Sequence, residues 1–461
     1  MTEPDWRAPL LAGLPLRSAP GDDATAPASV SWAPAEVGGH EVVVAAWDFA
    51  VAGGSFGERD ATSWVDAADY AASTARPLVA LVRSGGTRLP EGVRALVGMA
   101  RATIARQRLA AAGVPLLAVA DAPTTGGVLV TVVSRADLRC AVAGAVVGFA
   151  GPRVVEAITG TPPGADSHTA ESAAAAGIVD AVVAPGHVLD WLARALTALS
   201  GRPELTPSGA GADESPPRPQ PPADPWSQVL AARAPGRPAA GALLDALLDG
   251  AVRLSAPRAD ASVAAAVGRV AGGAAVAVAL AAQRGGRPTP DGYRLLRRAA
   301  HLADRLDLPL VTLVDTPGAE PTAAAEADGL AGAVAGAFSA LLTCRSPTLG
   351  VLVGEGGSGG ALAGLVCDLV LACPSSYFAA LVPEGAAVAL RTTPADAAAR
   401  LRLRPCDVLA LGIVDGMAPE PDDPTFTVRV AEALAALAAG ADEPRRAARL
   451  QRWSGPAPGS V

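Results

Sequence analysis

The stretch LGVLVGEGGSGGALAGLVC (Leu349–Cys367) joins an apolar run to a dense group of glycines. Its start has the composition of a short buried strand, and the glycines after it are typical of a tight turn that leads into a helix. Glycines let the backbone approach a ligand closely, and the free N–H groups of the first helical turn point at negative oxygen atoms. We therefore expect an anion-binding turn here, with Gly356, Gly357 and Ser358 as candidate binding residues.

The first half of the chain carries similar signals in the same order. PLVALV (Pro77–Val82) reads as a strand and is followed by SGGTRL (Ser84–Leu89). PLLAVAD (Pro115–Asp121) reads as the next strand and is followed by TTGGV (Thr124–Val128). The second half offers PLVTLV (Pro309–Val314) and then the glycine-rich stretch. Gly126 and Gly127 of the first half are therefore candidate binding residues too.

The spacing between matching residues is nearly constant, which indicates an internal duplication. The step in residue number from Pro77 to Pro309 is almost the same as the steps from Gly127 to Gly360 and from Gly177 to Gly412. Continuous apolar strands that alternate with helices predict sheets covered on both faces, and hence an α/β fold.

Composition divides the chain into five expected parts. Residues 1–35 are rich in Pro, Ala and Ser and predict a mobile tail, and residues 201–224 have the Pro, Gly and acidic content of a linker. Two folded domains are expected at 36–200 and 225–445, with a final tail at 446–461.

The charged residues exclude several classes of function. The formal net charge of the 461 residues is −8, which argues against a nucleic-acid partner. All 37 cationic residues are Arg and none is Lys. This chain therefore has no Schiff-base lysine, no Walker-type phosphate lysine and no attachment lysine for biotin or lipoate. Any such carrier must be a separate protein.

The cysteines and apolar stretches indicate a cytoplasmic protein. Five Cys without a Cys-x-x-Cys spacing predict reduced, buried thiols, and neither they nor the four His suggest a metal site. The weakly polar stretches are shorter than the ~20 residues of a membrane span, so no membrane partner is expected. The acidic start MTEPDW does not resemble a signal peptide.

Two arginines are candidate contacts for a phosphate or carboxylate. Arg88 closely follows a Gly-Gly pair, and Arg153 lies in GFAGPRV (Gly148–Val154) at the start of an expected helix. The alternative for both is an ordinary solvated or ion-paired arginine. The alternative for the glycines is that they only allow tight turns where helices pack on the sheet.

Other catalytic motifs fit poorly. Gly354–Gly359 matches Gly-x-Gly-x-x-Gly, but the helix after it is too short for a dinucleotide-binding crossover. Gly356–Gly360 matches the letters of a nucleophile elbow around Ser358, yet no His follows it, since His301 is the last. We interpret His301 and Glu355 as structural residues.

Longer strings resemble a known enzyme family. AWDFAVAGGSFG (Ala46–Gly57), SGGTRL and AVVGFAGPRVVEAI (Ala145–Ile158) closely resemble the β subunit of the bacterial acetyl-CoA carboxylase carboxyltransferase. GRPTPDGYRLLRRAAHLADRLDLPLVTLVDTPGAEP (Gly286–Pro321), GEGGSGGAL and YFAALVPEGAAVAL (Tyr377–Leu390) closely resemble its α subunit. The chain is thus similar to a fusion of β and α subunits.

The resemblance implies two crotonase-like domains that share an active site. It also implies transfer of CO₂ from carboxybiotin, held on a biotin carboxyl carrier protein and loaded by a biotin carboxylase, to acetyl-CoA, giving malonyl-CoA. Two oxyanions arise in that reaction, and backbone amides would stabilise both. By resemblance, Gly85 and Gly86 form one oxyanion hole, and Gly359 and Gly360 form the other, with Ala361 beside them as a candidate binding residue. A homo-oligomer is also implied.

The sequence departs from the family at several positions. The four-Cys zinc ribbon of the β subunit is absent, so no zinc is expected. Glu320 and Thr322 stand where Tyr and Gly are usual, and Arg391-Thr392 replaces Trp-Lys. These changes leave the acyl group open. They also leave two alternatives: a biotin-independent malonyl-thioester decarboxylase, or a non-catalytic scaffold of the carboxylase complex.

Overall fold

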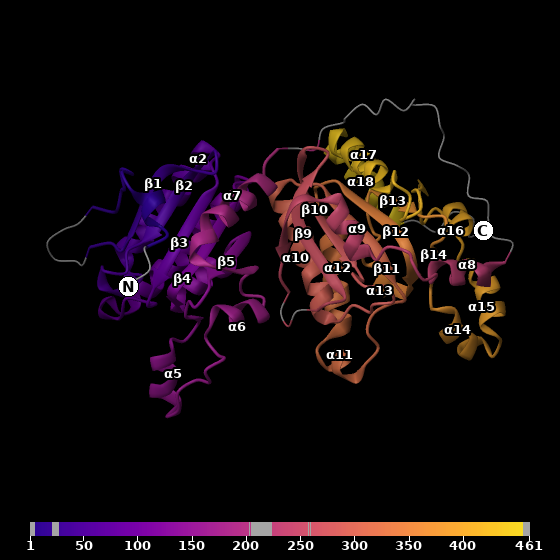
Figure 1. Ribbon diagram of the computed structural model, residues 1–461, viewed down its shortest axis with the longest axis horizontal. Helices are drawn as coiled ribbons and strands as arrows, with labels where there is room; N and C mark the ends of the chain where they lie inside the picture. The colour runs from indigo at the N-terminus through magenta and orange to yellow at the C-terminus, as the bar shows by residue number, and fades with distance from the viewer. Residues whose placement is uncertain are drawn as a thin grey trace. The chain divides into compact units, whose positions relative to one another are not determined.

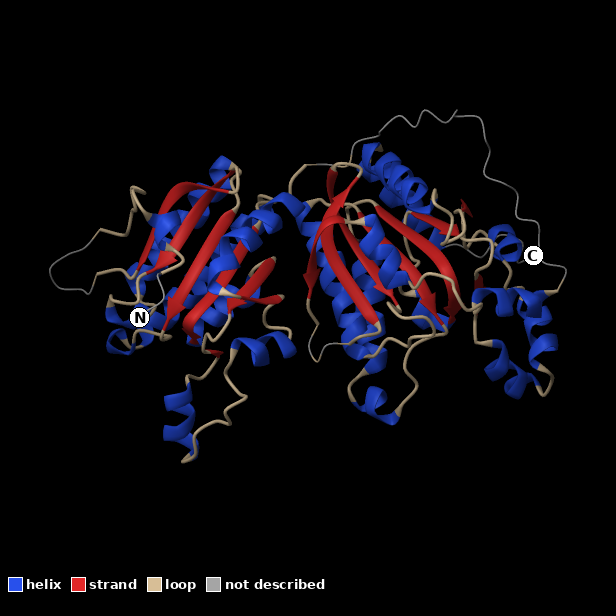
Figure 2. Cartoon of the chain, viewed as in Figure 1, coloured by secondary structure: helices blue, strands red, loops and turns tan. Residues whose placement is uncertain are grey.

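The computed structural model describes residues 5–20, 27–201, 203, 224–256, 258 and 260–454. These residues form two compact units, which divide between Thr197 and Ala198, except that Arg258 groups with the first unit. Most of the predicted linker, residues 201–224, lies outside the described residues. Each unit is an α/β structure with helices against a mixed sheet (Figures 1 and 2), so the predicted fold class is confirmed.

The first unit is built on a seven-stranded sheet in the order β1-β2-β3-β4-β5-β7, with β6 beside β4. Its strands are β1 Val30–Val37, β2 His40–Trp47, β3 Leu78–Ser84, β4 Leu116–Thr125, β5 Leu138–Val142, β6 Val147–Gly148 and β7 Ala181–Val183. Its helices are α1 Ala8–Leu11, α2 Glu58–Thr74, α3 Val93–Ala111, α4 Gly126–Thr131, α5 Pro152–Thr159, α6 Ala170–Ala175 and α7 Val188–Ala198. Among the described strands of this unit, β1 and β2 pair antiparallel and the other strand pairs are parallel.

The second unit repeats this order and adds an antiparallel edge strand, β8. Its strands are β8 Asp249–Leu254, β9 Val263–Val270, β10 Gly273–Leu280, β11 Leu310–Thr316, β12 Thr348–Gly357, β13 Leu369–Ala372, β14 Tyr377–Ala379 and β15 Gly416–Met417. Its helices are α8 Pro225–Ala232, α9 Ala240–Leu247, α10 Pro290–Leu306, α11 Ala323–Ala327, α12 Leu330–Thr343, α13 Ser358–Leu362, α14 Pro383–Leu390, α15 Pro394–Leu401, α16 Pro405–Ala410, α17 Phe426–Ala439 and α18 Asp442–Ser454.

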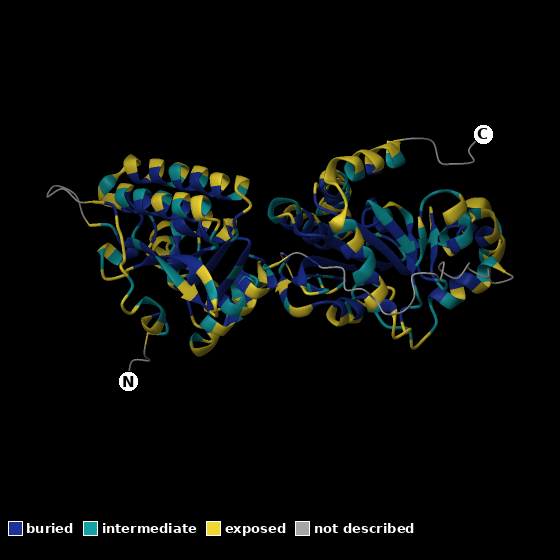
Figure 3. Cartoon of the chain, turned by 90° about the horizontal axis from the view of Figure 1, so that it is seen from above, coloured by how far each residue is buried: buried dark blue, intermediate teal, exposed yellow. Residues whose placement is uncertain are grey.

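The duplication is visible strand by strand. β3 and β11 start at Leu78 and Leu310, and β4 and β12 start at Leu116 and Thr348, so the step in residue number is identical for both pairs. The central strands are buried almost throughout (Figure 3) because helices cover both of their faces, as their unbroken apolar runs predict. Parallel strands bring their carboxyl ends to one edge of each sheet, where the glycine motifs lie.

The amino-terminal domain begins earlier than residue 36. β1 starts at Val30 and pairs along its whole length with β2, and α1 lies further upstream. The Pro-rich composition suggested a mobile tail, but Pro34 is tolerated because β1 is the edge strand of its sheet. Burial of Trp32 and Val37 ties this strand to the core.

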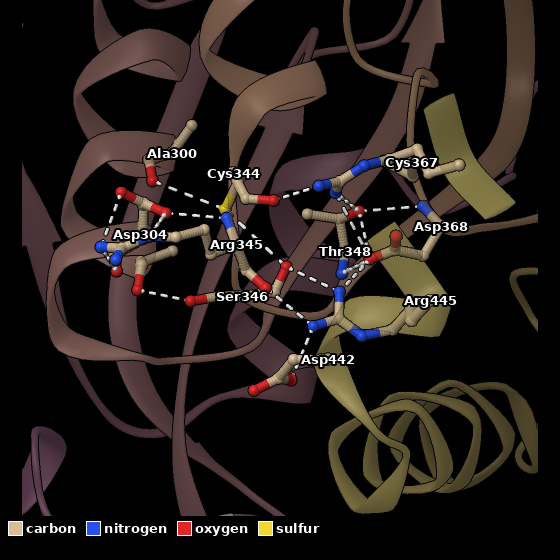
Figure 4. A network of polar contacts seen from close by, with 12 residues as sticks. Ala300, Asp304, Cys344, Arg345, Ser346, Thr348, Cys367, Asp368, Asp442 and Arg445 are labelled. Atoms are coloured by element: carbon tan, nitrogen blue, oxygen red, sulfur yellow. Dashed lines mark hydrogen bonds and ion pairs between the residues drawn. The ribbon is translucent and has the colours of Figure 1, made fainter. Parts of the chain in front are cut away.

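The carboxyl-terminal tail expected from residue 446 is also partly folded, because α18 continues to Ser454. Figure 4 shows how α18 is held at the amino end of β12. Arg445 donates to the Asp368 carboxylate at 2.7 Å, and the Thr348 backbone N–H donates to the same oxygen at 2.8 Å. Arg449, 1% exposed, reaches the same group. The Arg-rich composition had hidden this anchoring role.

Candidate functional site

In the first unit, two glycine segments meet at the carboxyl ends of β3 and β4. Gly86 has a φ of 109° and Gly126 a φ of 66°, backbone conformations that favour glycine. A Cβ atom on Gly126 would lie 2.8 Å from the Cα atom of Gly86. The close approach of the two backbones therefore explains both glycines.

The amides of Gly85 and Gly86 are already used inside the protein. The Gly85 N–H donates to the Gly53 carbonyl at 2.9 Å, and the Gly86 N–H donates to the Ser84 hydroxyl at 3.2 Å. The expectation that these two amides form the oxyanion hole is therefore corrected. They shape the turn, and other N–H groups are left for a ligand.

At this edge of the sheet, the described residues Thr87 and Gly127 have backbone amides without an acceptor. The Gly126 N–H, next to Gly127, donates to the Phe149 carbonyl at 2.8 Å. Within the described residues, neither Thr87 nor Gly127 donates a backbone hydrogen bond. We call this pair the first cradle. It combines the loop after β3 with the first turn of α4.

The second unit holds an equivalent pair of segments, Pro317–Ala319 after β11 and Gly357–Gly360 where β12 ends and α13 begins. Gly318 has a φ of 132°, and its N–H donates to the Thr316 hydroxyl at 3.1 Å, as Gly86 does to Ser84. A Cβ atom on Gly357 would overlap with the Pro317 carbonyl. The two turns thus share one design.

The second cradle consists of the amides of Ala319, Gly359 and Gly360. A Cβ atom on Gly360 would lie 2.6 Å from the Ala319 nitrogen, so the two segments are in close contact. Across the described part of the chain, none of these three amides has a hydrogen-bond acceptor in the protein. Gly359 and Gly360 were predicted from the sequence, but Ala319 was missed. Gly318 follows Gly86 by the same step that relates Pro309 to Pro77, and this repeat could have found it.

The glycines of the motif are not all in a turn. Gly356 and Gly357 are the last two residues of the buried strand β12, and the helix starts directly at Ser358. Close packing explains both glycines, because a Cβ atom on Gly356 would meet Phe378 of β14 and one on Gly357 would overlap with the Pro317 backbone. Ser358 has a φ of 65°, matching the 66° of Gly126. Ala361 is buried one turn into α13.

The two candidate arginines differ in their surroundings. Arg88 is 3% exposed, and its guanidinium contacts the Asp60 carboxylate at 2.7 Å and the Ser55 carbonyl at 2.7 Å. Its donors are occupied, so the structure assigns it to an internal ion pair and corrects its expected role as a ligand contact. Arg153 lies exposed on α5.

A polar cluster lies beside the second cradle. Glu355 of β12 accepts hydrogen bonds from Arg233 and from the Tyr377 hydroxyl, both at 2.7 Å, and Arg233 also contacts Glu384 of α14. Burial raises the pKa of the Asp315 carboxyl to about 6, although a hydrogen bond from the Glu355 backbone opposes this shift. The hydrogen bond from Arg233 lowers the pKa of Glu384. Glu355 therefore has a structural environment, as interpreted from the sequence.

The described residues contain no group of three or more His, Cys, Asp or Glu side chains arranged to hold a metal ion. Among those same residues, no helix is both long and apolar enough to cross a membrane. Each unit instead presents unused backbone N–H groups at the carboxyl edge of its sheet. Such groups stabilise negative charge that develops on a ligand oxygen.

Comparison with known proteins agrees with this geometry. The family model for acetyl co-enzyme A carboxylase carboxyltransferase-like proteins matches residues 222–438. The chain is 39% identical to the acetyl-coenzyme A carboxylase carboxyl transferase subunits beta/alpha of Salinispora arenicola, over 87% of this chain and 76% of that protein. It is 37% identical to a probable biotin-dependent acyl-coenzyme A carboxylase beta3 subunit of Mycobacterium tuberculosis, over 92% and 88%.

A solved structure of transcarboxylase 12S superimposes with a TM-score of 0.76 at 25% sequence identity, and covers 91% of this chain and 84% of that one. Its similarity spans both units and supports the crotonase-like fold expected from the sequence. With relatives of this identity along most of its length, the chain belongs to the carboxyltransferase family of the biotin-dependent acyl-CoA carboxylases.

Proposed function

We propose that this protein is the carboxyltransferase component of a biotin-dependent carboxylase and that it converts acetyl-CoA to malonyl-CoA, for fatty acid or polyketide supply. The observation that carries the proposal is the pair of backbone cradles, one in each duplicated unit. A carboxyl transfer of this kind develops negative charge on two oxygen atoms, the thioester oxygen of the enolate and the ureido oxygen of biotin. Two cradles match two oxyanions.

The residues of this chain act through backbone groups. The amides of one cradle donate to the thioester oxygen as the α-carbon loses its proton, and the amides of the other donate to the ureido oxygen. Each donor of this kind is worth about 3 kcal/mol of barrier lowering. Carboxybiotin supplies the carboxyl group, and the ureido nitrogen that loses it takes up the α-proton. No side-chain nucleophile is needed.

The partners follow from the same proposal. The chain has no lysine, so biotin must arrive on a separate carrier protein that a biotin carboxylase loads. The hexamer assembly described for transcarboxylase 12S supports a homo-oligomer here as well. The buried thiols of Cys140, Cys344, Cys367 and Cys373 favour a reducing, cytoplasmic location.

The reverse half-reaction tests the proposal with the purified chain alone. We expect malonyl-CoA to be converted to acetyl-CoA only when biocytin or free biotin is added. Conversion without biotin would instead identify a decarboxylase. If malonyl-CoA is inert and methylmalonyl-CoA is consumed with biocytin, the reaction class holds and the acyl group is corrected. Inertness of both would favour the scaffold alternative.

A further inference from the structure

The ladder between β11 and β12 is interrupted just before the second cradle. Val314 pairs with Leu352, and the next pair is Thr316 with Gly356. One residue of β11 therefore faces three residues of β12, which leaves backbone groups of β12 without a strand partner. The single residue on the β11 side is Asp315.

The Asp315 side chain fills this interruption. It is 2% exposed, and its Oδ1 atom accepts the Glu355 backbone N–H at 2.8 Å. Gly354 faces the same carboxylate, and a Cβ atom on Gly354 would overlap with Oδ1. The absence of a side chain at Gly354 is what allows the carboxylate to reach the strand. A carboxylate thus replaces the missing backbone acceptor.

The far side of Glu355 is also held. Its side chain accepts from Arg233, at the carboxyl end of α8, and from Tyr377 of β14, so its backbone and its carboxylate are both fixed. The residues that follow Glu355 lead into the amides of the second cradle, and those that follow Asp315 lead to Ala319. The hydrogen bond from the Glu355 N–H to Asp315 therefore connects the two strands just before both segments of the second cradle.

We propose that Asp315 is a positioning residue, whose hydrogen bond to the Glu355 amide sets the distance between Ala319 and Gly360. Through that bond the carboxylate fixes the geometry of the second cradle without touching the substrate. The role in catalysis rests on the function proposed above, whereas the effect on the backbone does not.

The second oxygen of the Asp315 carboxylate, Oδ2, takes no part in the bond to the Glu355 amide. Within the described part of the chain Oδ2 has no hydrogen-bond partner, and Asp315 borders a cavity of about 250 Å³ lined also by Arg233, Arg284 and Pro235. An asparagine keeps the accepting Oδ1 atom without a charge. The positioning role therefore requires only one oxygen, and this separates it from a role of the negative charge.

The test compares three variants with the wild type in the biocytin-dependent consumption of malonyl-CoA. Asp315→Ala removes the acceptor and is expected to lower kcat at least about thirtyfold, with KM for the CoA thioester changed less than about threefold, because the cradle acts on the transition state. Asp315→Asn is expected to restore kcat to within about threefold of the wild type. Gly354→Ala, a change on β12, places a methyl group where the Asp315 carboxylate lies and displaces that carboxylate. It is expected to lower kcat as much as Asp315→Ala does.

Two matched controls separate positioning from general damage. Asp368→Asn removes a buried carboxylate at the amino end of β12, and Gly350→Ala adds a methyl group inside the same strand. Both are expected to leave kcat per folded molecule within about threefold of the wild type.

Amide hydrogen exchange supplies a readout that needs no turnover. In Asp315→Ala, peptides that cover residues 316–320 and 355–361 are expected to exchange at least about tenfold faster, and those at the amino end of β12 are not. Unchanged exchange in both peptides, or an equal loss of kcat in Asp315→Ala and Asp315→Asn, overturns the proposal. A wild type that turns over no thioester refutes the proposed function, while the exchange result still decides the backbone claim.

Discussion

The two units share a register shift between their two central strands, but different side chains occupy it. In both units the register of the parallel strand pair shifts near the end of the strands. In the first unit Val82 of β3 pairs with Ala120 of β4, and the next pair is Ser84 with Thr124. The residue inside the interruption is Arg83 there and Asp315 in the second unit. Arg83 forms an ion pair with Asp121 at 2.8 Å, whereas Asp315 bonds directly to a backbone amide.

This difference shows which part of a duplicated fold is constrained. The interruption, the left-handed glycine and the hydroxyl that caps it recur at equivalent positions of both units, because they place the amides of each cradle. The charges behind the amides do not recur. Catalysis by backbone groups requires a backbone geometry, and more than one polar arrangement can hold it.

The largest difference between the units is expected when the cradles are filled. In Gly360→Ala, the new methyl group would lie 2.6 Å from the Ala319 nitrogen, which is backbone and cannot yield easily. In Gly127→Ala, it would lie 2.6 Å from the Met99 sulfur, in a flexible side chain. We expect kcat to fall about a thousandfold in Gly360→Ala and about tenfold in Gly127→Ala.

The assay for this pair is the biocytin-dependent consumption of malonyl-CoA, with circular dichroism as the check on folding. Equal losses in the two variants would contradict the distinction between a rigid and a yielding neighbour.

A second contrast concerns Arg88 and Glu320, which occupy equivalent positions in the matching loops of the two units. Arg88 is paired with the fully buried Asp60, so Arg88→Met leaves this carboxylate without its cationic partner and is expected to lower the free energy of unfolding by about 3 kcal/mol. Glu320→Gln, at a half-buried position, is expected to change it by less than about 0.5 kcal/mol. Urea unfolding measures both. A stable Arg88→Met with a raised KM would restore Arg88 as a ligand contact.

The free energy of unfolding is expected to depend on pH through Asp315, the residue inside the interruption of the second unit. Its folded-state pKa of about 6 lies above the ordinary value of 3.8, so the folded state binds the extra proton. Stability linked to this group therefore rises as pH falls from about 7 towards 4, and its ionisation costs about 3 kcal/mol at neutral pH. Asp315→Asn removes that cost.

We expect Asp315→Asn to be more stable than the wild type at about pH 8, with the advantage shrinking by about 1.4 kcal/mol at about pH 5. Thermal unfolding at several pH values tests this, and an advantage that does not vary with pH contradicts the assignment.

A smaller effect than for Arg88→Met or Asp315→Asn is expected for Tyr377→Phe. This change removes one of the two hydrogen bonds to Glu355 and keeps the one from Arg233, so it should cost about 1 kcal/mol of stability. The free energy of unfolding from urea titration is the measurement. A loss as large as that of Arg88→Met would show that the hydroxyl, and not the guanidinium, holds Glu355.

The sequence predicted the fold more fully than the site. Apolar runs and constant offsets were sufficient to predict the α/β class and the duplication, because the burial of a strand is visible in its own run of apolar residues. The amides that are free to bind a ligand could not be predicted in the same way. The Gly85 N–H, for example, donates to the carbonyl of Gly53, which is distant in the chain. The pairing of Arg88 with Asp60 likewise depends on tertiary contacts. Only the missed Gly318–Ala319 segment was within reach, through its offset from Gly86.

The most direct test of the central claim follows the carboxyl group itself. Malonyl-CoA that is radiolabelled in its free carboxyl group is incubated with the protein and biocytin, and the label is sought on biocytin and in released CO₂. Carboxyl transfer by two backbone cradles predicts label on biocytin with the wild type and almost none with Gly360→Ala. Label that appears only as CO₂, at a rate independent of biocytin, would contradict it.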